Sequence, residues 1–329
     1  MHLRFLYCFW LLLVSFTVSK VEAQSIVSQL SPKVDTAYVD LSYDSWSVRA
    51  IGIYKYQNPV IRNGAGNKVR FVPKNPTSIG LGLAYKFLAI DIGVRLLLIR
   101  EDVTSRFDLQ GEASFGNHLA DLTVQRYKGF DQEGAMRSIF RNDIRSTVVG
   151  VNYLYNFNSK KLSIRSVFTG NRRQKKSAGS FTVGGFISVQ DIAADSSIVA
   201  GEEGFDERAQ LQNSRFNIIG IQGGYNYMLV LPYRFYVFGG LTPGMGLLNG
   251  EVTATDHYDI NSRLVTKLNI RAAVGHNGQR FYSGIVYGSD IFFMNISADN
   301  KFNYNIGKLK LVIGYKFNRK LKFLDEVLE

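Results

Sequence analysis

Few side chains in this sequence have the types and spacing needed for nucleophilic or metal chemistry. The chain contains four histidines and one cysteine, Cys8, which lies in the apolar run at its start. No two histidines have metal-ligand spacing, so we expect no metal and no cofactor. His118 and Ser114 are close enough in sequence to suggest a Ser–His lipid hydrolase at a barrel rim. Two surface side chains near a short turn explain this pair with fewer assumptions, so the sequence predicts no catalytic residue.

A second group of residues has the spacing of a charged lumen. In several segments every second residue is apolar, and the residues between them are acids, amides or cations. If these segments are neighbouring strands, the acids form one wall and the cations of the later strands form another. Such walls would suit the passage of a polar or zwitterionic solute, or they would form an ion-pair network that fills a narrow barrel. The predicted inward-facing residues are Asp91, Arg95, Asp108, Gln110, Glu112, Asp121, Gln125, Lys267, Asn269, Arg271, Lys308, Lys310 and Lys316.

The densest basic run consists of Arg172, Arg173, Lys175 and Lys176. It lies in segment 160–179, which fits poorly as a strand. A solvated turn explains such a run, but the run could also bind anionic lipid or pair with the acidic wall. We therefore consider residues 160–179 as an inward helix or plug.

Strict alternation identifies the strands that position these side chains. In segment 309–317, Leu309, Leu311 and Ile313 alternate with small or cationic residues, and the apolar row ends in Tyr315 and Phe317. Segment 79–87 repeats this pattern. A period of two over nine residues indicates a strand with two different environments, and an aromatic end to the apolar face is typical of transmembrane β-barrels.

The same pattern recurs along the chain and predicts a single-domain, antiparallel transmembrane β-barrel of about twelve strands, with ten to fourteen as the range. Short periplasmic turns should alternate with longer outer loops. We expect the long loops at 63–76, 99–104, 130–143, 193–214, 249–262 and 295–304. The expected strands are 46–62, 77–87, 89–98, 105–115, 118–129, 144–157, 180–192, 215–231, 234–248, 263–275, 280–294 and 305–318.

The two ends of the chain indicate export. Residues 1–23 have the basic start, apolar run and small residues of a cleavable signal peptide, which would remove Cys8 and leave a mature chain without thiols. We expect a periplasmic lead-in at 24–45, the barrel at 46–318 and a charged tail at 319–329. No later run approaches the length of a transmembrane helix. These features predict the outer membrane of a Gram-negative bacterium.

The composition narrows the expected partners. The net charge is +12, with 39 Lys+Arg against 27 Asp+Glu. No nucleic-acid-binding motif accompanies this charge, so we expect no nucleic acid partner. We expect contacts with outer-membrane lipid and lipopolysaccharide, and with the barrel-assembly machinery during insertion. The 18 Tyr and 23 Phe suit strands with aromatic girdles.

Several short stretches resemble one family. They are Tyr54-Lys55-Tyr56-Gln57, Val72-Pro73-Lys74-Asn75-Pro76 followed by Gly80-Leu81-Gly82, Gln125-Arg126-Tyr127-Lys128-Gly129-Phe130, Gln174-Lys175-Lys176-Ser177-Ala178-Gly179-Ser180 and Gly314-Tyr315-Lys316-Phe317. Together they resemble the domain of unknown function 4421 family, presumed outer-membrane proteins of Bacteroidota. The resemblance covers most of the mature chain. It implies an exported barrel and lends no catalytic residue.

Three functional hypotheses follow. The first is a non-enzymatic barrel, acting as a narrow channel or transporter for small polar solutes or as a structural envelope protein. The second is a lipid-modifying hydrolase built like a phospholipase barrel. The third is a soluble periplasmic β-protein, which would extract without detergent.

Overall fold

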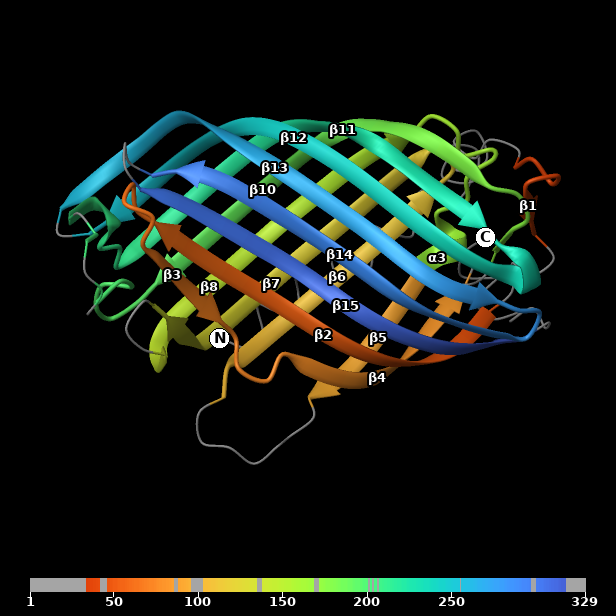
Figure 1. Ribbon diagram of the computed structural model, residues 1–329, viewed down its shortest axis with the longest axis horizontal. Coiled ribbons are helices and arrows are strands. Elements are labelled where there is room, and N and C mark those ends of the chain that lie inside the picture. Colours follow the sequence, from red (N-terminus) through yellow and green to blue (C-terminus); the bar gives the residue numbers. More distant parts are fainter. Residues whose placement is uncertain are drawn as a thin grey trace, which may run out of the picture.

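The computed structural model shows an antiparallel β-barrel (Figure 1). It describes residues 34–41, 46–85, 88–95, 103–134, 138–168, 172–200, 202, 204–205, 207–254, 256–296 and 300–317. The expected signal peptide, the beginning of the lead-in and the charged tail lie outside these residues.

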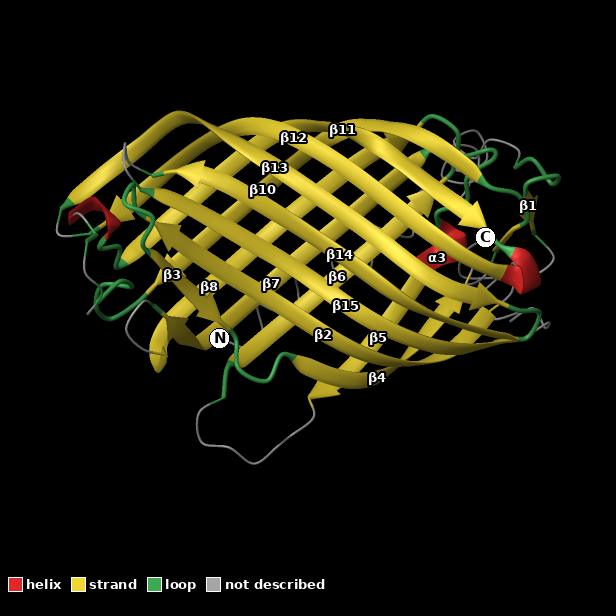
Figure 2. Cartoon of the chain, viewed as in Figure 1, coloured by secondary structure: helices red, strands yellow, loops and turns green. Residues whose placement is uncertain are grey.

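Ten strands form a closed hydrogen-bonded ring (Figure 2). Each pairs antiparallel with the next, and the last, β15, pairs back along the first, β2, from Trp46 to Arg62. The ring strands are β2 (Trp46–Arg62), β3 (Lys68–Val72), β7 (His118–Glu133), β8 (Ser138–Asn156), β10 (Ala178–Ala193), β11 (Asn213–Val230), β12 (Phe235–Thr253), β13 (His257–Asn277), β14 (Phe281–Asn295) and β15 (Lys301–Phe317).

Three further strands widen the wall between β2 and β7. They are β4 (Thr77–Tyr85), β5 (Leu88–Arg95) and β6 (Ser105–Phe115). β4 pairs with the first part of β2 and with β5, and β6 pairs with the first part of β7. Further along, the short β3 joins β2 directly to β7. The wall between β2 and β7 is therefore one strand wide at one end of the barrel and three strands wide at the other.

A β-bulge in β7 marks the change of partner from β6 to β3. Gly129 interrupts the register between Lys128 and Phe130 and has a φ of +84°, in the left-handed region that favours glycine. Its carbonyl accepts a hydrogen bond of 2.7 Å from Thr104 Oγ1, and Thr104 Oγ1 accepts one of 2.6 Å from the backbone N–H of Lys74. The bulge therefore ties β7 to the segments that precede β4 and β6.

The expected count of twelve strands is not confirmed. A strand is present at each of the twelve expected positions, but the hydrogen-bonded ring closes through β3, which lies inside the expected loop 63–76. Glycine, asparagine and proline flank this five-residue strand and hide its alternation. The expected long loops at 130–143 and 249–262 were also wrong, because β7, β8, β12 and β13 extend well into them.

The two ends of the barrel differ. We call the end with the short turns after β4, β6, β11 and β13 the turn end; it also carries α3 (Arg165–Phe168), η2 (Pro232–Arg234) and a small sheet of β1 (Val39–Asp40) with β9 (Arg173–Gln174). The loop end is opposite and carries η1 (Glu207–Ala209) (Figure 1). None of the helices in the described ranges is long and apolar enough to span a membrane.

The outward face of the strands is apolar. Leu309, Leu311 and Ile313, the row that first indicated a strand, are all exposed on the outer surface, and β4 exposes Leu81 in the same way. At the turn end this face ends in touching aromatic rings. The ring pairs there are Trp46–Phe317, stacked at 3.9 Å between centroids, Phe281–Tyr315, Phe235–His276, Phe181–Tyr225 and Tyr155–Phe157.

The interior has three layers along the barrel axis. The loop-end core is apolar, with Phe71, Phe130, Phe216 and Phe302 among its members, and it draws side chains from every ring strand. The middle layer is charged and forms the candidate site. The turn-end core is apolar again and includes Leu154, Met228 and Phe238.

Segment 160–179 folds into the turn end of the barrel. Leu162 and Ile164, which precede the short helix α3, and Val167 within it are buried in the turn-end core. This inward course explains why the segment does not alternate like a strand.

Candidate functional site

Inward-facing side chains of seven strands form the charged layer. Alternate residues of β2, β5, β6, β7, β13, β14 and β15 point inward because successive side chains of a strand project to opposite faces. The acids come from β5, β6, β7 and β14, and the cations come from β2, β13 and β15. The acids of β6 and β7 therefore face cations of β13 and β15 across a narrow lumen, and Asp290 of β14 lies among those cations.

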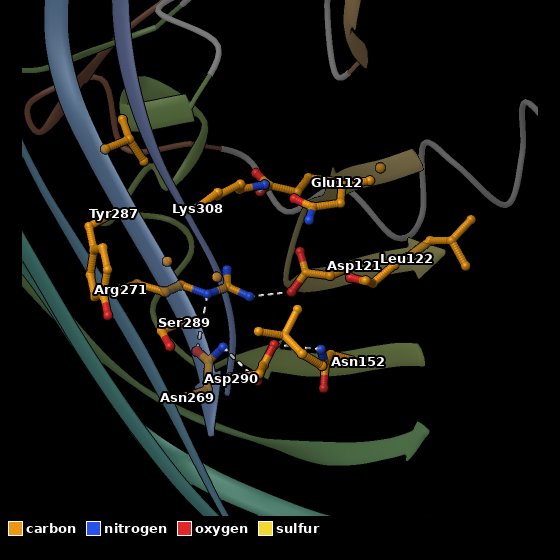
Figure 3. A pocket seen from close by; sticks show the side chains of 17 residues that line it. Glu112, Asp121, Leu122, Asn152, Asn269, Arg271, Tyr287, Ser289, Asp290 and Lys308 are labelled. Carbon is orange, nitrogen blue, oxygen red and sulfur yellow. Dashed lines mark hydrogen bonds and ion pairs between the residues drawn. The ribbon is translucent and has the colours of Figure 1, made fainter. Parts of the chain in front are cut away.

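Two ion pairs cross the lumen between these walls. Lys308 Nζ lies 2.7 Å from Glu112 Oε1, and the Arg271 guanidinium binds the carboxylate of Asp121. Figure 3 shows Arg271 reaching from β13 toward Asp121, with Lys308 and Glu112 beside them. These contacts join residues far apart in sequence and fix the spacing of the walls.

Asp91 on β5 accepts from two cations. Arg49 lies 2.7 Å from Asp91 Oδ1, and Lys310 Nζ lies 3.0 Å from Oδ2. The Arg49–Asp91 contact passes over Gly82 of β4, which is in register with both residues. A Cβ atom at Gly82 would lie 2.1 Å from the Asp91 carboxylate, so this ion pair requires glycine there.

Asp108 on β6 is the centre of a third cluster. It accepts from Lys55 Nζ at 2.8 Å, from Gln125 Nε2 at 2.9 Å and from the Tyr127 hydroxyl at 2.9 Å. Gln125 and Tyr127 belong to one of the stretches that carry the family resemblance, and their structural role is to hold this carboxylate.

Asp290 on β14 anchors the fourth cluster. Lys267 Nζ lies 2.9 Å from Asp290 Oδ1. Asn269 donates to the same oxygen at 3.0 Å (Figure 3). The Lys267 side chain is 0% exposed. Its ammonium lies 4.6 Å from the centre of the Phe186 ring, at the border with the loop-end core, so it also makes a cation–π contact.

Little space remains around Arg271 and Asp121. The pocket around Arg271, Asp121 and Asp290 has a volume of about 60 Å³, and the pocket next to it, toward Ile164 and Arg165, has about 70 Å³. Volumes of this size hold a few water molecules. We call these two adjoining pockets together the central chamber.

The structure brings most of the predicted inward residues together, but it adds three that the sequence did not single out. Arg49, Lys55 and Asp290 each complete an ion pair. The alternation of the first strand was the available signal for two of them, but Ile51 and Ile53 share their face and mask it. Gln110 lines both central pockets. The Arg95 side chain lies outside the described ones, and Lys316 lies nearer the turn end, bonded to Asn277 and the Gly278 carbonyl.

The basic run makes contacts with the N-terminal lead-in. Arg173 Nη2 lies 2.9 Å from Asp40 Oδ2, Lys175 donates to the Thr36 carbonyl, and Lys176 lies over the Tyr38 ring. The Arg172 carbonyl accepts a hydrogen bond from Asn277 at 2.8 Å. Among the described residues of segment 160–179, Ile164 and Arg165 reach the pocket toward the turn end.

The Ser–His pair is separated by the barrel wall. Ser114 lines the central chamber and is in register with the buried Leu119. His118 lies on the aromatic outer face, where its Nδ1 is 2.7 Å from the Tyr153 hydroxyl. The two side chains therefore do not form a nucleophile and base. The described part of the chain also holds no cluster of three potential metal-ligating residues.

Comparisons with known proteins place the chain in a family. A family model described as "Domain of unknown function (DUF4421)" matches residues 33–317, and no curated protein matches the sequence. The translocator domain of the autotransporter NalP from Neisseria meningitidis is a similar solved structure, with 11% identity, a TM-score of 0.34, and coverage of 83% of this chain and 88% of that one.

Two further barrels are similar at the same level. The beta domain of a Bordetella autotransporter, BrkA, has 9% identity, a TM-score of 0.31, and coverage of 83% of this chain and 100% of that one. The in-vitro folded OmpT, an outer membrane protein of Vibrio cholerae, has 10% identity, a TM-score of 0.25, and coverage of 83% and 98%.

Proposed function

We propose that this chain, which belongs to the DUF4421 family of unknown function, is a non-enzymatic outer-membrane barrel of the transporter type. In this proposal the barrel is closed at rest and binds a small polar solute in its central chamber. The apolar outward face and the aromatic rings at the turn end support a location in a membrane. The short turns would then face the periplasm.

The observation that carries the proposal is a charged chamber between two apolar cores. An open porin has a water-filled, polar lumen. Here the loop-end core fills the lumen on one side, and the turn-end core, with Leu162, Ile164 and Val167, fills it on the other. A polar layer enclosed in this way favours binding and gated passage over steady conduction.

The charges suit a small polar ligand. Removing ions from water is costly, so a buried layer of ion pairs stays only if its geometry is good. A zwitterionic or charged solute could exchange with the two ion pairs that cross the lumen, because Asp121 and Glu112 each meet a cation from the opposite wall. A barrel that served only as a structural element of the envelope would need no such chamber.

The first test is the ion conductance of the refolded mature protein in a planar bilayer. We expect the wild type to insert and to remain silent. Steady conductance would refute the closed chamber. Heat-modifiable migration of the folded barrel on a denaturing gel provides the control for folding.

The second test measures access to the chamber with a thiol reagent. We expect Gln110→Cys in the mature chain to react slowly with a water-soluble maleimide. Replacing Leu162, Ile164 and Val167 together by serine should open the turn end and speed the reaction. Tyr233→Cys, at a turn position that is 87% exposed, is the fast control. Fast labelling of Gln110→Cys in the otherwise unchanged barrel would contradict the proposal.

A further inference from the structure

Four exposed lysines gather around one tyrosine ring at the turn end. They form two pairs of sequence neighbours, and each pair lies near one end of segment 160–179. Lys161 Nζ lies 5.1 Å from the centre of the Tyr38 ring, and Lys176 Nζ lies 5.6 Å from it. We call this group the lysine cluster. Its members are Lys160, Lys161, Lys175 and Lys176.

A buried amide side chain holds the two pairs at a fixed spacing. Gln174 Nε2 donates to the Lys161 carbonyl at 2.5 Å and to the Lys176 carbonyl at 3.0 Å. Its Oε1 accepts from the backbone N–H of Ser163 at 3.0 Å, and the residue is 6% exposed. The lysine cluster is therefore built into the fold by contacts between the two ends of the segment.

The contacts of the lysine cluster leave its charge in place. Tyr38 offers only a ring, and Lys175 Nζ donates to a neutral group, the Thr36 carbonyl, at 2.8 Å. The acids of the described lead-in have other contacts. Asp40 Oδ2 lies 2.9 Å from Arg173 Nη2, and Asp35 Oδ1 accepts a backbone N–H of its own segment at 2.9 Å.

The neighbouring parts of the sequence do not offset this charge. Segments 24–33, 42–45, 86–87, 169–171 and 318–329 adjoin the turn end in sequence and lie outside the described residues. By residue type they carry five cations and four acids, so their net charge cannot cancel that of four lysines. These residues are Lys33, Lys86, Arg319, Lys320 and Lys322 against Asp44, Asp325, Glu326 and Glu329.

Exposed aromatic rings border the lysine cluster. Phe157 and Phe181 are 60% and 69% exposed, and both belong to the ring pairs that end the apolar outer face. The Phe157 N–H donates to the Phe181 carbonyl at 3.1 Å, and one turn later the Lys161 N–H donates to the Asn158 carbonyl at 3.1 Å. Aromatic girdles of barrels lie at the membrane–water interface. The lysine cluster therefore lies at the depth of lipid head groups, where lysines attract anionic lipids.

We propose that the lysine cluster is a binding site for an anionic phospholipid of the leaflet at the turn end. The phosphate lies among the ammonium groups, and the acyl chains lie along Phe157 and Phe181. The adjoining rings favour a lipid over a water-soluble polyanion, because they offer a surface to acyl chains. The proposal uses the location of the barrel in a membrane and does not depend on a closed chamber.

The experiment measures quenching of a girdle tryptophan by brominated lipids. Phe157→Trp reports on the lysine cluster. Phe281→Trp, 64% exposed in the girdle beside the single cation Arg280, is the matched position; both variants carry Trp46→Phe. Phosphatidylcholine vesicles contain a graded fraction of phosphatidylglycerol or phosphatidylcholine with acyl chains brominated near the head group.

We expect a preference for the anionic lipid at position 157 only. There, half-maximal quenching should need an at least about five-fold lower fraction of phosphatidylglycerol than of phosphatidylcholine, which is the effect of one lysine at an anionic surface. At position 281 the two lipids should differ much less. Equal quenching by both lipids at position 157, or the same preference at position 281, overturns the proposal.

Three sets of charge variants test the lysines themselves. Replacing all four by glutamine should abolish the preference at position 157, and replacing all four by arginine should keep it. The control removes four exposed cations from the loop end and should also keep it: Arg62→Gln, Lys68→Gln, Arg70→Gln and Lys301→Gln. Heat-modifiable migration checks folding. A preference that survives the glutamine set, or is lost equally in the control, refutes the lysine cluster as its cause.

Two soluble competitors separate a lipid from other anions. Neither glycerol 3-phosphate nor polyglutamate should reverse the quenching by phosphatidylglycerol, because neither has acyl chains. Reversal by the first at low concentration would assign the site to a free phosphate, and reversal by the second would assign it to a polyanion; either result overturns the lipid. Failure here is distinct from failure of the proposed function, since steady conductance refutes the closed chamber and unselective quenching refutes only the lipid site.

Discussion

The ion pair between Lys267 and Asp290 offers a quantitative test of the charged layer. Lys267→Met removes the charge and keeps most of the side-chain volume. Breaking a buried ion pair by removing one partner costs about 3–5 kcal/mol of unfolding free energy. Asp290 keeps the amide of Asn269 at 3.0 Å, so we expect a loss of about 3 kcal/mol, at the low end of that range.

The double variant separates the pair from its surroundings. Asp290→Asn alone should cost about 2 kcal/mol, because Lys267 keeps a neutral acceptor. Lys267→Met with Asp290→Asn should also cost about 2 kcal/mol, less than the two single losses together, since no uncompensated charge remains. The coupling would then be about 3 kcal/mol.

The assay is urea unfolding of the refolded barrel in lipid vesicles, followed by Trp46 fluorescence. Trp46 and Trp10 are the only tryptophans in the sequence, and Trp10 lies in the expected signal peptide. Trp46 is stacked on Phe317, so its emission reports closure between β2 and β15. The control is Asp195→Asn, which breaks the exposed ion pair with Arg145 and should lower the unfolding free energy by less than about 1 kcal/mol. Additive single losses, or a Lys267→Met loss below about 1 kcal/mol, would refute the reasoning.

Three further changes test particular contacts. Gly82→Ala should cost about 1–3 kcal/mol in urea unfolding, because its Cβ would displace the Asp91 carboxylate; an unchanged midpoint would show that the ion pair adjusts freely. Tyr127→Phe should cost about 1–2 kcal/mol by the same measurement, since it removes one of the donors to Asp108, and a stabilised variant would contradict this role. Arg173→Gln should leave the barrel stable but speed cleavage of the N-terminal lead-in by protease, because the ion pair to Asp40 is lost; an unchanged cleavage rate would argue against this anchor.

Strand positions could be predicted because a barrel wall separates two environments. Leu309, Leu311 and Ile313 must face outward together, and Lys308 and Lys310 must face inward, whichever strands lie beside them. The inward position of Asp121, Glu112 and Arg271 followed from the same alternation. Both features depend only on the residues within each strand.

The partners of the charged residues could not be predicted in this way. Arg271 binds Asp121 across the lumen, and Lys310 binds Asp91. Both pairs join residues far apart in the sequence, and they meet only because the ring closes. Closure through β3 could not be foreseen either. This strand has only five residues between turn-forming residues, which is too few for its alternation to be recognised. The basic run of segment 160–179 was considered as a partner for the acidic wall, but Arg173 pairs with Asp40 instead.

The two-residue period is a local property of the backbone, so it determined without further information that the chain forms strands with an apolar and a polar face. It also determined which side chains share each face. How many strands close the ring, and which acids meet which cations, is decided only when the chain has folded. Those outcomes depend on register and closure between segments distant in the chain, and no local pattern contains that information.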